Sequence, residues 1–397
     1  MRTVGLAGKP NAGKSTFFRA ATLADAETGN YPFTTIDANR GVAAARTECP
    51  CLALDERCPH CRDGARYVPV ELLDVAGLVP GAHEGRGLGN QFLDELRQAD
   101  AILHVVDAAG ATDPEGEPLE VGDHDPTEDV AFLEGELDAW IAGVLRDNWD
   151  GMERRSKTPD FELEPELVEV LSGVGATEPD VRRALRRVDP PETIQAWTDE
   201  EIEAFATAIR DEAKPILIAA NKADVAPPEN LEALDAVAAG DEGVEDVVPT
   251  SARYEHTLRQ GDAQGVIEYR PGDDDFAVVG DLNDDQAAGL ETIREYLAEH
   301  GGTGVQAALN AAVYDVLDMI TAYPVEDSTN WRGGEDDEVL PDAHLLPRGS
   351  TPRDLAYAIH GDIGDGYLHA VDARTDQRIS DETELEEGAV IEIVSTA

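Results

Sequence analysis

The sequence predicts an α/β protein in three parts: a mostly parallel sheet, a helical lobe inserted into that sheet, and a small C-terminal β-grasp domain. Short apolar segments such as residues 101–107 and 215–220 are typical of buried strands, and they alternate with helical segments. Between residues 126 and 212 the apolar residues recur instead at helical spacing. After residue 322, short alternating strands flank one helix at residues 351–360.

These changes of pattern set the predicted domain limits. The limits are 1–125 and 213–322 for the sheet domain, 126–212 for the helical domain and 323–397 for the β-grasp domain. Two helices, expected at residues 283–300 and 304–322, close the sheet domain and lead onward. The insertion is long enough to pack as a lobe of its own.

The chain is strongly acidic, with a formal net charge of −52 over 397 residues. Such a charge repels itself in dilute buffer, but molar salt screens the repulsion because the Debye length falls to about 3 Å. We interpret the composition as adaptation to a halophile's cytoplasm. An acidic disordered protein is excluded, because 42% of the residues are apolar and fall into periodic segments. No segment has the pattern of an export signal or a membrane span, so we expect a cytoplasmic protein without a membrane partner.

Residues 8–16 read Gly-Lys-Pro-Asn-Ala-Gly-Lys-Ser-Thr and match the P-loop pattern G-x-x-x-x-G-K-[ST] at every fixed position. The motif follows an apolar strand at residues 2–6 and precedes a helical segment at residues 15–23, which is the context that such a loop requires. Glycines let backbone N–H groups point at phosphates, and the helix N-terminus adds unpaired donors. The expected phosphate-binding residues are Asn11, Ala12, Gly13, Lys14, Ser15 and Thr16.

A second segment supplies candidate contacts for Mg²⁺ and the γ-phosphate. Residues 69–77 form a predicted strand that ends in Asp-Val-Ala-Gly. Asp74 is expected to hold Mg²⁺ through water, together with the Ser15 hydroxyl. The Gly77 amide is expected to reach the γ-phosphate.

A polar and aromatic loop at residues 30–36 lies between these two motifs. The Thr35 hydroxyl can complete the Mg²⁺ shell while the γ-phosphate is present and let go after hydrolysis, as a switch loop does. A plain connecting loop is the alternative. The candidate catalytic residues are therefore Lys14, Thr35 and Gly77.

Two later segments fit the recognition of guanine. Residues 221–224, Asn-Lys-Ala-Asp, follow one apolar strand, and residues 251–252, Ser-Ala, follow another, with the second amide placed to meet the guanine carbonyl. The Asp224 carboxylate can accept hydrogen bonds from N1–H and the exocyclic amine of guanine, whereas adenine has no donor at N1. Asn221 is expected to brace the loop, and the stem of Lys222 to cover the ring face. The predicted ligands are GTP and GDP, held at the base by Asn221, Lys222, Asp224, Ser251 and Ala252.

The motifs resemble those of the Obg-related P-loop GTPases, and within them the YchF-like group in its archaeal form. The matching stretches are residues 5–16, residues 31–35 and the long, specific segment 74–93. The resemblance spans essentially the whole chain, since the C-terminal segment is similar to a TGS domain. It implies a P-loop GTPase fold and a GTP-hydrolysing switch that works with translation, docking to the ribosome or RNA through the TGS-like and helical domains. Bacterial and eukaryotic members carry a variant guanine motif that relaxes base choice toward ATP, whereas residues 221–224 here favour GTP.

One position departs from the pattern of many GTPases. Leu78 follows the Asp-x-x-Gly motif, where many GTPases carry a glutamine that positions the attacking water. A leucine cannot orient water, so we expect slow intrinsic hydrolysis. His83 and His124 flank the site, but we expect both at the surface. Related GTPases that lack the glutamine are thought to use a K⁺ ion instead, and the resemblance implies that Asn11 would hold such an ion against the phosphates. The alternative is that Asn11 braces the loop through a hydrogen bond.

Two other functions remain compatible with these residues. The chain can be a nucleotide-loaded module that docks to the ribosome or RNA, with hydrolysis incidental; its net acidity neither supports nor excludes such contacts. The second alternative is an ATPase. Competition of ATP against bound GTP distinguishes an ATPase from a GTPase.

All four cysteines lie close together, in residues 49–51 (Cys-Pro-Cys) and residues 58–61 (Cys-Pro-His-Cys). Cytoplasmic thiols stay reduced, which argues against a disulfide framework. The spacing suggests a loop that holds Zn²⁺, with His60 as a spare ligand, although the C-x-C half is tighter than the usual C-x-x-C turn. A redox-sensitive thiol cluster and inert packing are the alternatives. The candidate zinc ligands are Cys49, Cys51, Cys58 and Cys61, expected on a hairpin beside the loop at 30–36 and Asp74.

Overall fold

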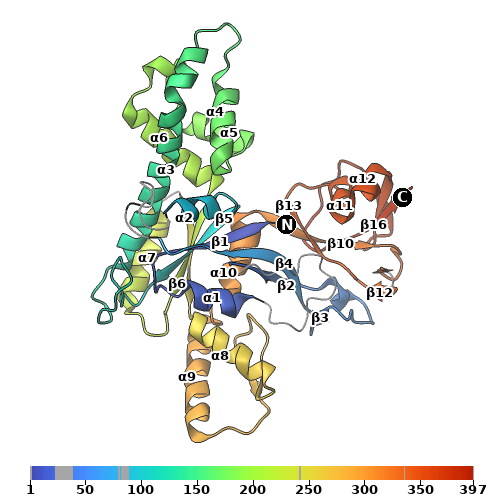
Figure 1. Ribbon diagram of the computed structural model, residues 1–397. Coiled ribbons are helices and arrows are strands. Elements are labelled where there is room, and N and C mark those ends of the chain that lie inside the picture. The colour runs from blue at the N-terminus through green and yellow to red at the C-terminus, as the bar shows by residue number, and fades with distance from the viewer. Residues whose placement is uncertain are drawn as a thin grey trace. The chain divides into compact units, whose positions relative to one another are not determined.

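The computed structural model describes residues 2–22, 39–78, 81, 89–240, 243–334 and 336–396. These residues form two compact units (Figure 1). The larger unit contains residues 2–42 and 71–308, and the smaller unit contains residues 43–70 and 309–396. Among the described helices, none is both long and apolar enough to cross a lipid bilayer.

The larger unit is built on a parallel sheet in the order β4, β1, β5, β6, β7. The strands are β1 (Thr3–Ala7), β4 (Ala65–Asp74, which enters this unit at residue 71), β5 (Ala101–Asp107), β6 (Ile216–Asn221) and β7 (Val244–Thr250). β1, β5 and β6 are buried along their whole length, which is why their sequences are continuous apolar runs. Parallel strands end at one edge of the sheet, so Asp74, Asp107 and Asn221 share that edge.

Helices connect these strands and extend the unit beyond them. They are α1 (Lys14–Ala21), α2 (Gly89–Leu96), α7 (Pro228–Gly240), α8 (Ala252–Ala263), α9 (Asp284–His300) and α10 (Val305–Asn310). The short antiparallel strands β8 (Ile267–Glu268) and β9 (Ala277–Val278) lie between α8 and α9. α9 begins at a capping box between Asn283 and Gln286 and ends at Gly301, whose φ is 72°. These end signals explain why the helix matches its predicted range.

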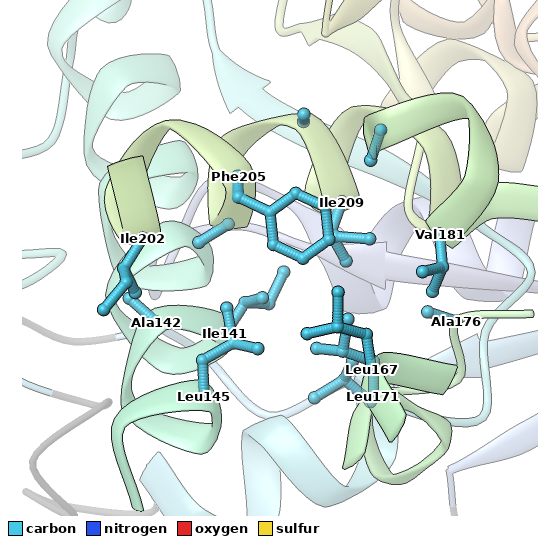
Figure 2. Close-up of a cluster of buried hydrophobic side chains, with 14 of the residues drawn as sticks. Ile141, Ala142, Leu145, Leu167, Leu171, Ala176, Val181, Ile202, Phe205 and Ile209 are labelled. Carbon is cyan, nitrogen blue, oxygen red and sulfur yellow. The ribbon is translucent and has the colours of Figure 1, made fainter. Parts of the chain in front are cut away.

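The predicted inserted lobe is present and consists of α3 (Pro126–Arg155), α4 (Leu163–Leu171), α5 (Glu178–Val188) and α6 (Asp199–Ala213). Figure 1 shows α3 running from the sheet into the lobe. The side chain of Asp125 caps α3, and Thr198 caps α6 through a capping box with Glu201. The four helices meet in an apolar core of their own (Figure 2). Its labelled members are Ile141, Ala142, Leu145, Leu167, Leu171, Ala176, Val181, Ile202, Phe205 and Ile209.

The smaller unit contains a five-stranded sheet in the order β13, β10, β16, β14, β15. The strands are β10 (Met319–Val325), β13 (His344–Pro347), β14 (Tyr367–Asp372), β15 (Gln377–Ile379) and β16 (Ala389–Ser395). α11 (Pro352–Ile359) packs on this sheet through Leu355 and Ala356, and α12 (Gly361–Asp365) follows. Residues 43–70 add most of β2 (Arg40–Glu48), β3 (Cys61–Arg62) and the start of β4. β11 (Arg332–Gly333) and β12 (Glu338–Val339) form a short antiparallel pair.

The predicted helix at residues 304–322 is helical as far as residue 316 and wrong beyond it. α10 is followed by a π-helical turn over Ala311–Val316, and Asp318 then takes a left-handed φ of 46°. The chain continues as β10, which pairs with β13 on one side and β16 on the other. This two-sided pairing buries every residue of β10, and such tertiary context overrides a local helical pattern.

The compact units group two segments differently from the predicted domain limits. Residues 43–70, expected in the sheet domain, belong with the C-terminal sheet, and so do residues 309–322. The reason is an apolar cluster in which cysteines from the first segment pack against side chains of β10 and β12. The domain limits themselves stay a prediction.

Candidate nucleotide-binding site

The P-loop lies between β1 and α1, and its geometry depends on residues with positive φ. Gly13, with φ of 108°, directly precedes α1, and a Cβ there would come to 2.1 Å from Nδ2 of Asn221. Only glycine fits such a position. Asn11 has φ of 60°, and its Nδ2 donates to the carbonyl of Gly116 at 2.9 Å. Residues 11–16 therefore lie at the N-terminus of α1, where helical N–H groups favour an anion.

Lys14 is buried beneath the loop. Its Nζ donates to the carbonyl oxygens of Gly8 at 2.8 Å and Lys9 at 2.9 Å. Burial lowers the pKa of Lys14 to about 8, although the Asp74 carboxylate acts in the opposite direction. A buried cation with mostly neutral partners is suited to receive a phosphate group.

Ser15 and Asp74 meet at the end of β4. The Ser15 hydroxyl donates to Oδ2 of Asp74 at 3.3 Å, and burial raises the pKa of this carboxyl. Gly77 also lies against the P-loop, since a Cβ on it would come to 3.2 Å from Cγ of Pro10. The structure thus brings three predicted residues together around the loop. Thr35 lies outside the described residues.

Asn221 and Ser251 organise the predicted base site. The Asn221 amide donates to the carbonyl of Ala12 at 2.9 Å and accepts from the N–H of Ala252 at 3.1 Å, so it joins the P-loop to the start of α8. The Ser251 hydroxyl donates to Oδ1 of Asp224 at 2.8 Å and fixes that carboxylate. A cavity of about 220 Å³ is lined by Gly13, Thr16, Asn221, Lys222, Asp224, Val225 and Arg253.

Two residues predicted at the base have partners inside the protein. The N–H of Ala252 is engaged with Asn221, so a guanine carbonyl would have to share it. Lys222 has φ of 63°, and its Nζ lies 2.9 Å from Oδ2 of Asp107. Lys222 also lines the cavity, and its role as cover for a ring face stays a prediction.

A buried network behind the P-loop was not predicted. Nζ of Lys9 lies 2.9 Å from Oδ2 of Asp129 and donates to the carbonyl of Thr112 at 2.7 Å. Oδ1 of Asp129 lies 2.9 Å from Nε2 of His124. The network joins the P-loop to the first turn of α3, the helix that carries the lobe. His124, expected at the surface, is buried because it pairs with Asp129.

Leu78 contacts the P-loop through its backbone only. Its N–H donates to the carbonyl of Gly8 at 3.1 Å, while its side chain is 1% exposed and packs in the core with Phe92 and Leu96. A side chain in this core is shielded from solvent. His83 lies outside the described residues.

The four cysteine sulfur atoms converge in the smaller unit, all within 4.8 Å of one another. Sγ of Cys49 lies 3.5 Å from that of Cys58, and Sγ of Cys51 lies 3.6 Å from that of Cys61. All four are free thiols. Hydrogen bonding from Cys49 lowers the pKa of Cys58, and burial raises the pKa of Cys61. The predicted hairpin is present, and the cysteines pack into the core of the smaller unit; the loop at residues 30–36, beside which they were expected, lies outside the described residues.

The sequence matches three family models in different parts. The matches are residues 3–132 with a family described as 50S ribosome-binding GTPase, residues 219–327 with the Obg-like GTPase YGR210-like, G4 motif-containing domain, and residues 337–395 with the TGS domain. The three models cover the P-loop, the predicted guanine motifs and the C-terminal sheet. They agree with the expected P-loop GTPase fold.

Full-length similarity agrees with these matches. An uncharacterized GTP-binding protein of Methanocaldococcus jannaschii is 44% identical over all of both chains. A crystal structure of a GTP-binding protein from Pyrococcus horikoshii OT3 is 40% identical, with a TM-score of 0.78 over all of both chains. The ribosome-binding ATPase YchF of Bacillus subtilis is 32% identical over 65% of this chain and 67% of its own length. The chain therefore belongs to the Obg-like, YchF-related family of P-loop GTPases with a C-terminal TGS domain.

Proposed function

We propose that this protein prefers GTP over ATP and hydrolyses it slowly, as a Mg²⁺-dependent switch. The observation that carries the preference is the Asp224 carboxylate, which Ser251 holds at the wall of the cavity next to the P-loop. A carboxylate there pairs with the two donors on the guanine edge, whereas adenine would leave it unpaired at a cost of several kcal/mol, roughly what an unpaired buried charge costs. The Asn221 bridge supports the same assignment, because it fixes the base loop relative to the phosphate loop.

Ser15 and Asp74 fit a magnesium ion. A hydroxyl and a carboxylate oxygen 3.3 Å apart are hard ligands of the kind that Mg²⁺ prefers. We propose that they hold the ion with Thr35, and that the bound ion neutralises charge on the phosphate oxygens during hydrolysis. Lys14 and the backbone N–H groups of residues 11–16 would position the phosphates, and the Gly77 amide would orient the γ-phosphate.

We propose that a K⁺ ion assists hydrolysis in place of a glutamine. The side chain of Leu78 is buried in the core, so the site needs another source of charge stabilisation. The Asn11 amide nitrogen braces Gly116, which supports the loop-bracing role, and its oxygen is the atom that would coordinate a cation. The two roles use different atoms and are compatible.

We also propose that the four cysteines bind Zn²⁺. Tetrahedral coordination at a Zn–S distance of about 2.3 Å puts the sulfur atoms about 3.8 Å apart. The observed separations of 3.5 and 3.6 Å, with all four atoms within 4.8 Å, fit this geometry. Four thiolates fill a tetrahedral shell, so the site would be structural and His60 would not be needed as a ligand.

We propose that the partner is the ribosome or its RNA. The support is the name of the Bacillus subtilis relative, ribosome-binding ATPase YchF, and the description of the family that matches residues 3–132. The TGS match at residues 337–395 and the helical lobe are the proposed docking surfaces. A docking module with incidental hydrolysis remains the second candidate, and we place either activity in a cytoplasm rich in salt.

Competition binding tests base choice directly. The full chain is first loaded with fluorescently labelled GTP in molar KCl with Mg²⁺. Unlabelled GTP, ATP or XTP is then added, and displacement of the labelled nucleotide is measured. We expect GTP to displace at concentrations at least 100-fold lower than ATP, which is the factor that about 2.7 kcal/mol of discrimination gives. Equal displacement by ATP would establish the ATPase alternative. Single-turnover hydrolysis with and without ribosomes then separates an enzyme from a docking module.

A further inference from the structure

We infer that the metal-loaded cysteine cluster is a clamp that makes residues 43–70 part of the C-terminal domain, with Arg66 as the residue that positions the cluster against that domain. This inference rests on the proposed zinc site and is independent of the proposed GTPase activity. Its basis is a set of contacts between segments more than 250 positions apart in the sequence.

The cysteines are part of the apolar core of the C-terminal domain rather than of a free loop. Cys49 and Cys51 are fully buried and Cys58 is 4% exposed. They share one cluster with side chains that all come from the C-terminal segment: Tyr323, Val325, Trp331, Val339, Leu340, Ala373 and Val390. Trp331 is itself fixed by a hydrogen bond from its indole N–H to the carbonyl of Ala373 at 3.0 Å. A metal that gathers the thiolates therefore also closes this core.

Arg66 connects the thiols to the C-terminal backbone. Its guanidinium donates to the carbonyl oxygens of Leu340 and Pro341, each at 3.2 Å, and lies 3.9 Å from Sγ of Cys58. The same group lies 5.9 Å from the ring centre of Tyr323. Arg66 is 3% exposed, so it uses its planar fork in a site with little water, which a lysine could not reproduce.

Charge explains why a metal would strengthen this contact. Zn²⁺ is held by four thiolates, so the loaded site carries a net charge of about −2. Arg66 is a buried cation next to one of the sulfur atoms, and it offsets part of that charge. Partners in the second coordination shell of this kind typically change metal affinity by 10–100-fold.

Other polar links also join the two segments. The Asn310 side chain accepts from the N–H of Arg46 at 2.8 Å and donates to the carbonyl of Arg46 at 3.0 Å, and two ion pairs lie nearer the cysteines. Nε2 of His60 lies 2.7 Å from Oε2 of Glu338, and Arg332 lies 2.7 Å from Oε2 of Glu56. Both pairs are partly or largely solvent-exposed, and such pairs contribute about 0–1 kcal/mol each. The buried cluster and Arg66 are therefore the links on which a bound metal would act directly.

The test compares the full chain with and without zinc. Reduced protein is analysed for bound metal, then stripped with a chelator and reloaded with Zn²⁺ or Co²⁺, while hydrogen exchange is followed by mass spectrometry. We expect close to one Zn²⁺ per chain and the visible absorption of a tetrahedral Co²⁺–thiolate site. We also expect chelation to speed exchange at least tenfold in residues 49–66 and 331–341, zinc to restore it, and GTP binding to remain.

Two variants and a control separate the clamp from a general packing effect. Cys58→Ser should lower the metal content and weaken the thiolate-to-cobalt absorption, because one sulfur ligand is lost. Arg66→Met should lower zinc affinity at least tenfold while leaving that absorption unchanged in the loaded protein. Arg378→Met removes an exposed arginine on β15 of the same domain and should change neither measurement. The inference would be overturned if the reduced chain bound no metal. It would also be overturned if the rate of hydrogen exchange in residues 331–341 were the same before and after chelation. Loss of GTP binding with an intact clamp would count against the proposed GTPase alone.

Discussion

Asp224 is the residue on which base choice depends. We expect Asp224→Asn to lower GTP affinity by about 3 kcal/mol, because the guanine donors lose a charged acceptor, and to favour xanthine nucleotide, whose C2 carbonyl suits an amide donor. Titration with GTP and XTP measures both changes. Glu229→Gln removes a charge from an exposed neighbour and serves as the control. Unchanged GTP affinity in Asp224→Asn would remove the guanine assignment.

The buried ammonium of Lys14 gives nucleotide binding a pH dependence. Burial lowers its pKa to about 8 in the free protein, and a bound phosphate favours the charged form and raises it. Above pH 8, binding must therefore take up a proton, so GTP affinity should be constant below pH 8 and fall by up to about tenfold per pH unit above it. Titrations from pH 7 to pH 9.5 measure the slope.

Lys214 provides a matched control for this pH effect. Burial lowers its pKa to about 8 as well, but its Nζ donates to the carbonyl of Ala99 rather than to the phosphate loop. Lys214→Met should therefore keep the same dependence of GTP affinity on pH. A flat profile in the parent protein would show that Lys14 stays charged throughout.

Asn11 carries the prediction for potassium. Hydrolysis builds negative charge on the phosphates, and a fixed cation stabilises that charge more in the transition state than in the ground state. GTP hydrolysis in molar KCl should exceed that in equal NaCl by about tenfold, or roughly 1.4 kcal/mol of barrier. Asn11→Ala should abolish the difference and leave most GTP binding intact. Equal rates of the parent protein in both salts would exclude the cation.

The parts of the site that depend on local sequence could be predicted, whereas the contacts between residues far apart in the sequence could not. Asp74, Asn221 and Asp224 follow apolar strands, so a strand pattern and a short motif locate them. The ion pair between Lys9 and Asp129 joins residues 120 positions apart, and no spacing rule connects them. The place of the cysteines was missed for the same reason, since only folding brings them to the C-terminal core.

Among the elements, the inserted lobe depends on a packed aromatic centre. Phe205 is fully buried and meets Trp197 edge to face, with ring centres 5.3 Å apart. Phe205→Ala should cost about 3–5 kcal/mol of unfolding free energy by leaving a cavity. Urea unfolding followed by the fluorescence of Trp149 and Trp197 measures the loss. Glu200→Ala on the exposed face of α6 is the control, and a cost below 1 kcal/mol for Phe205→Ala would contradict the packing argument.

Helices whose ends are marked by capping residues could be predicted from the sequence. Strands that depend on pairing with distant strands could not. α9 has a capping box at its start and a glycine at its end, and its limits follow from these residues. β10 has an apolar pattern that also fits a helix, and only its neighbours β13 and β16 decide between the two. The short strands β3, β8 and β9 are defined wholly by their partners.

For the whole molecule, the net charge of −52 predicts a stability that depends on salt. Self-repulsion of the compact state should weaken as the Debye length falls from about 10 Å at 0.1 M to about 3 Å at 1 M. The midpoint of thermal unfolding should therefore rise steadily between 0.1 M and 2 M KCl. An uncharged osmolyte at equal osmolarity is the control. A midpoint that stays constant across this range would refute the interpretation of the acidic composition as adaptation to salt.

The grouping of residues 43–70 with the C-terminal sheet bears on how such proteins exchange parts. The TGS match begins at residue 337, yet the interior strand β10 and the cysteine segment that complete its core lie before that point. A fragment that starts at residue 323 would expose Trp331 and Leu340, which pack against the cysteines in the full chain, and a fragment that starts at residue 337 would expose Leu340. Both fragments should aggregate. Recombination that replaces only the C-terminal segment would pack the segment of one relative against the cysteine hairpin of another, although the two parts form one core. Inheritance of this domain therefore requires two distant stretches of the gene to be kept together.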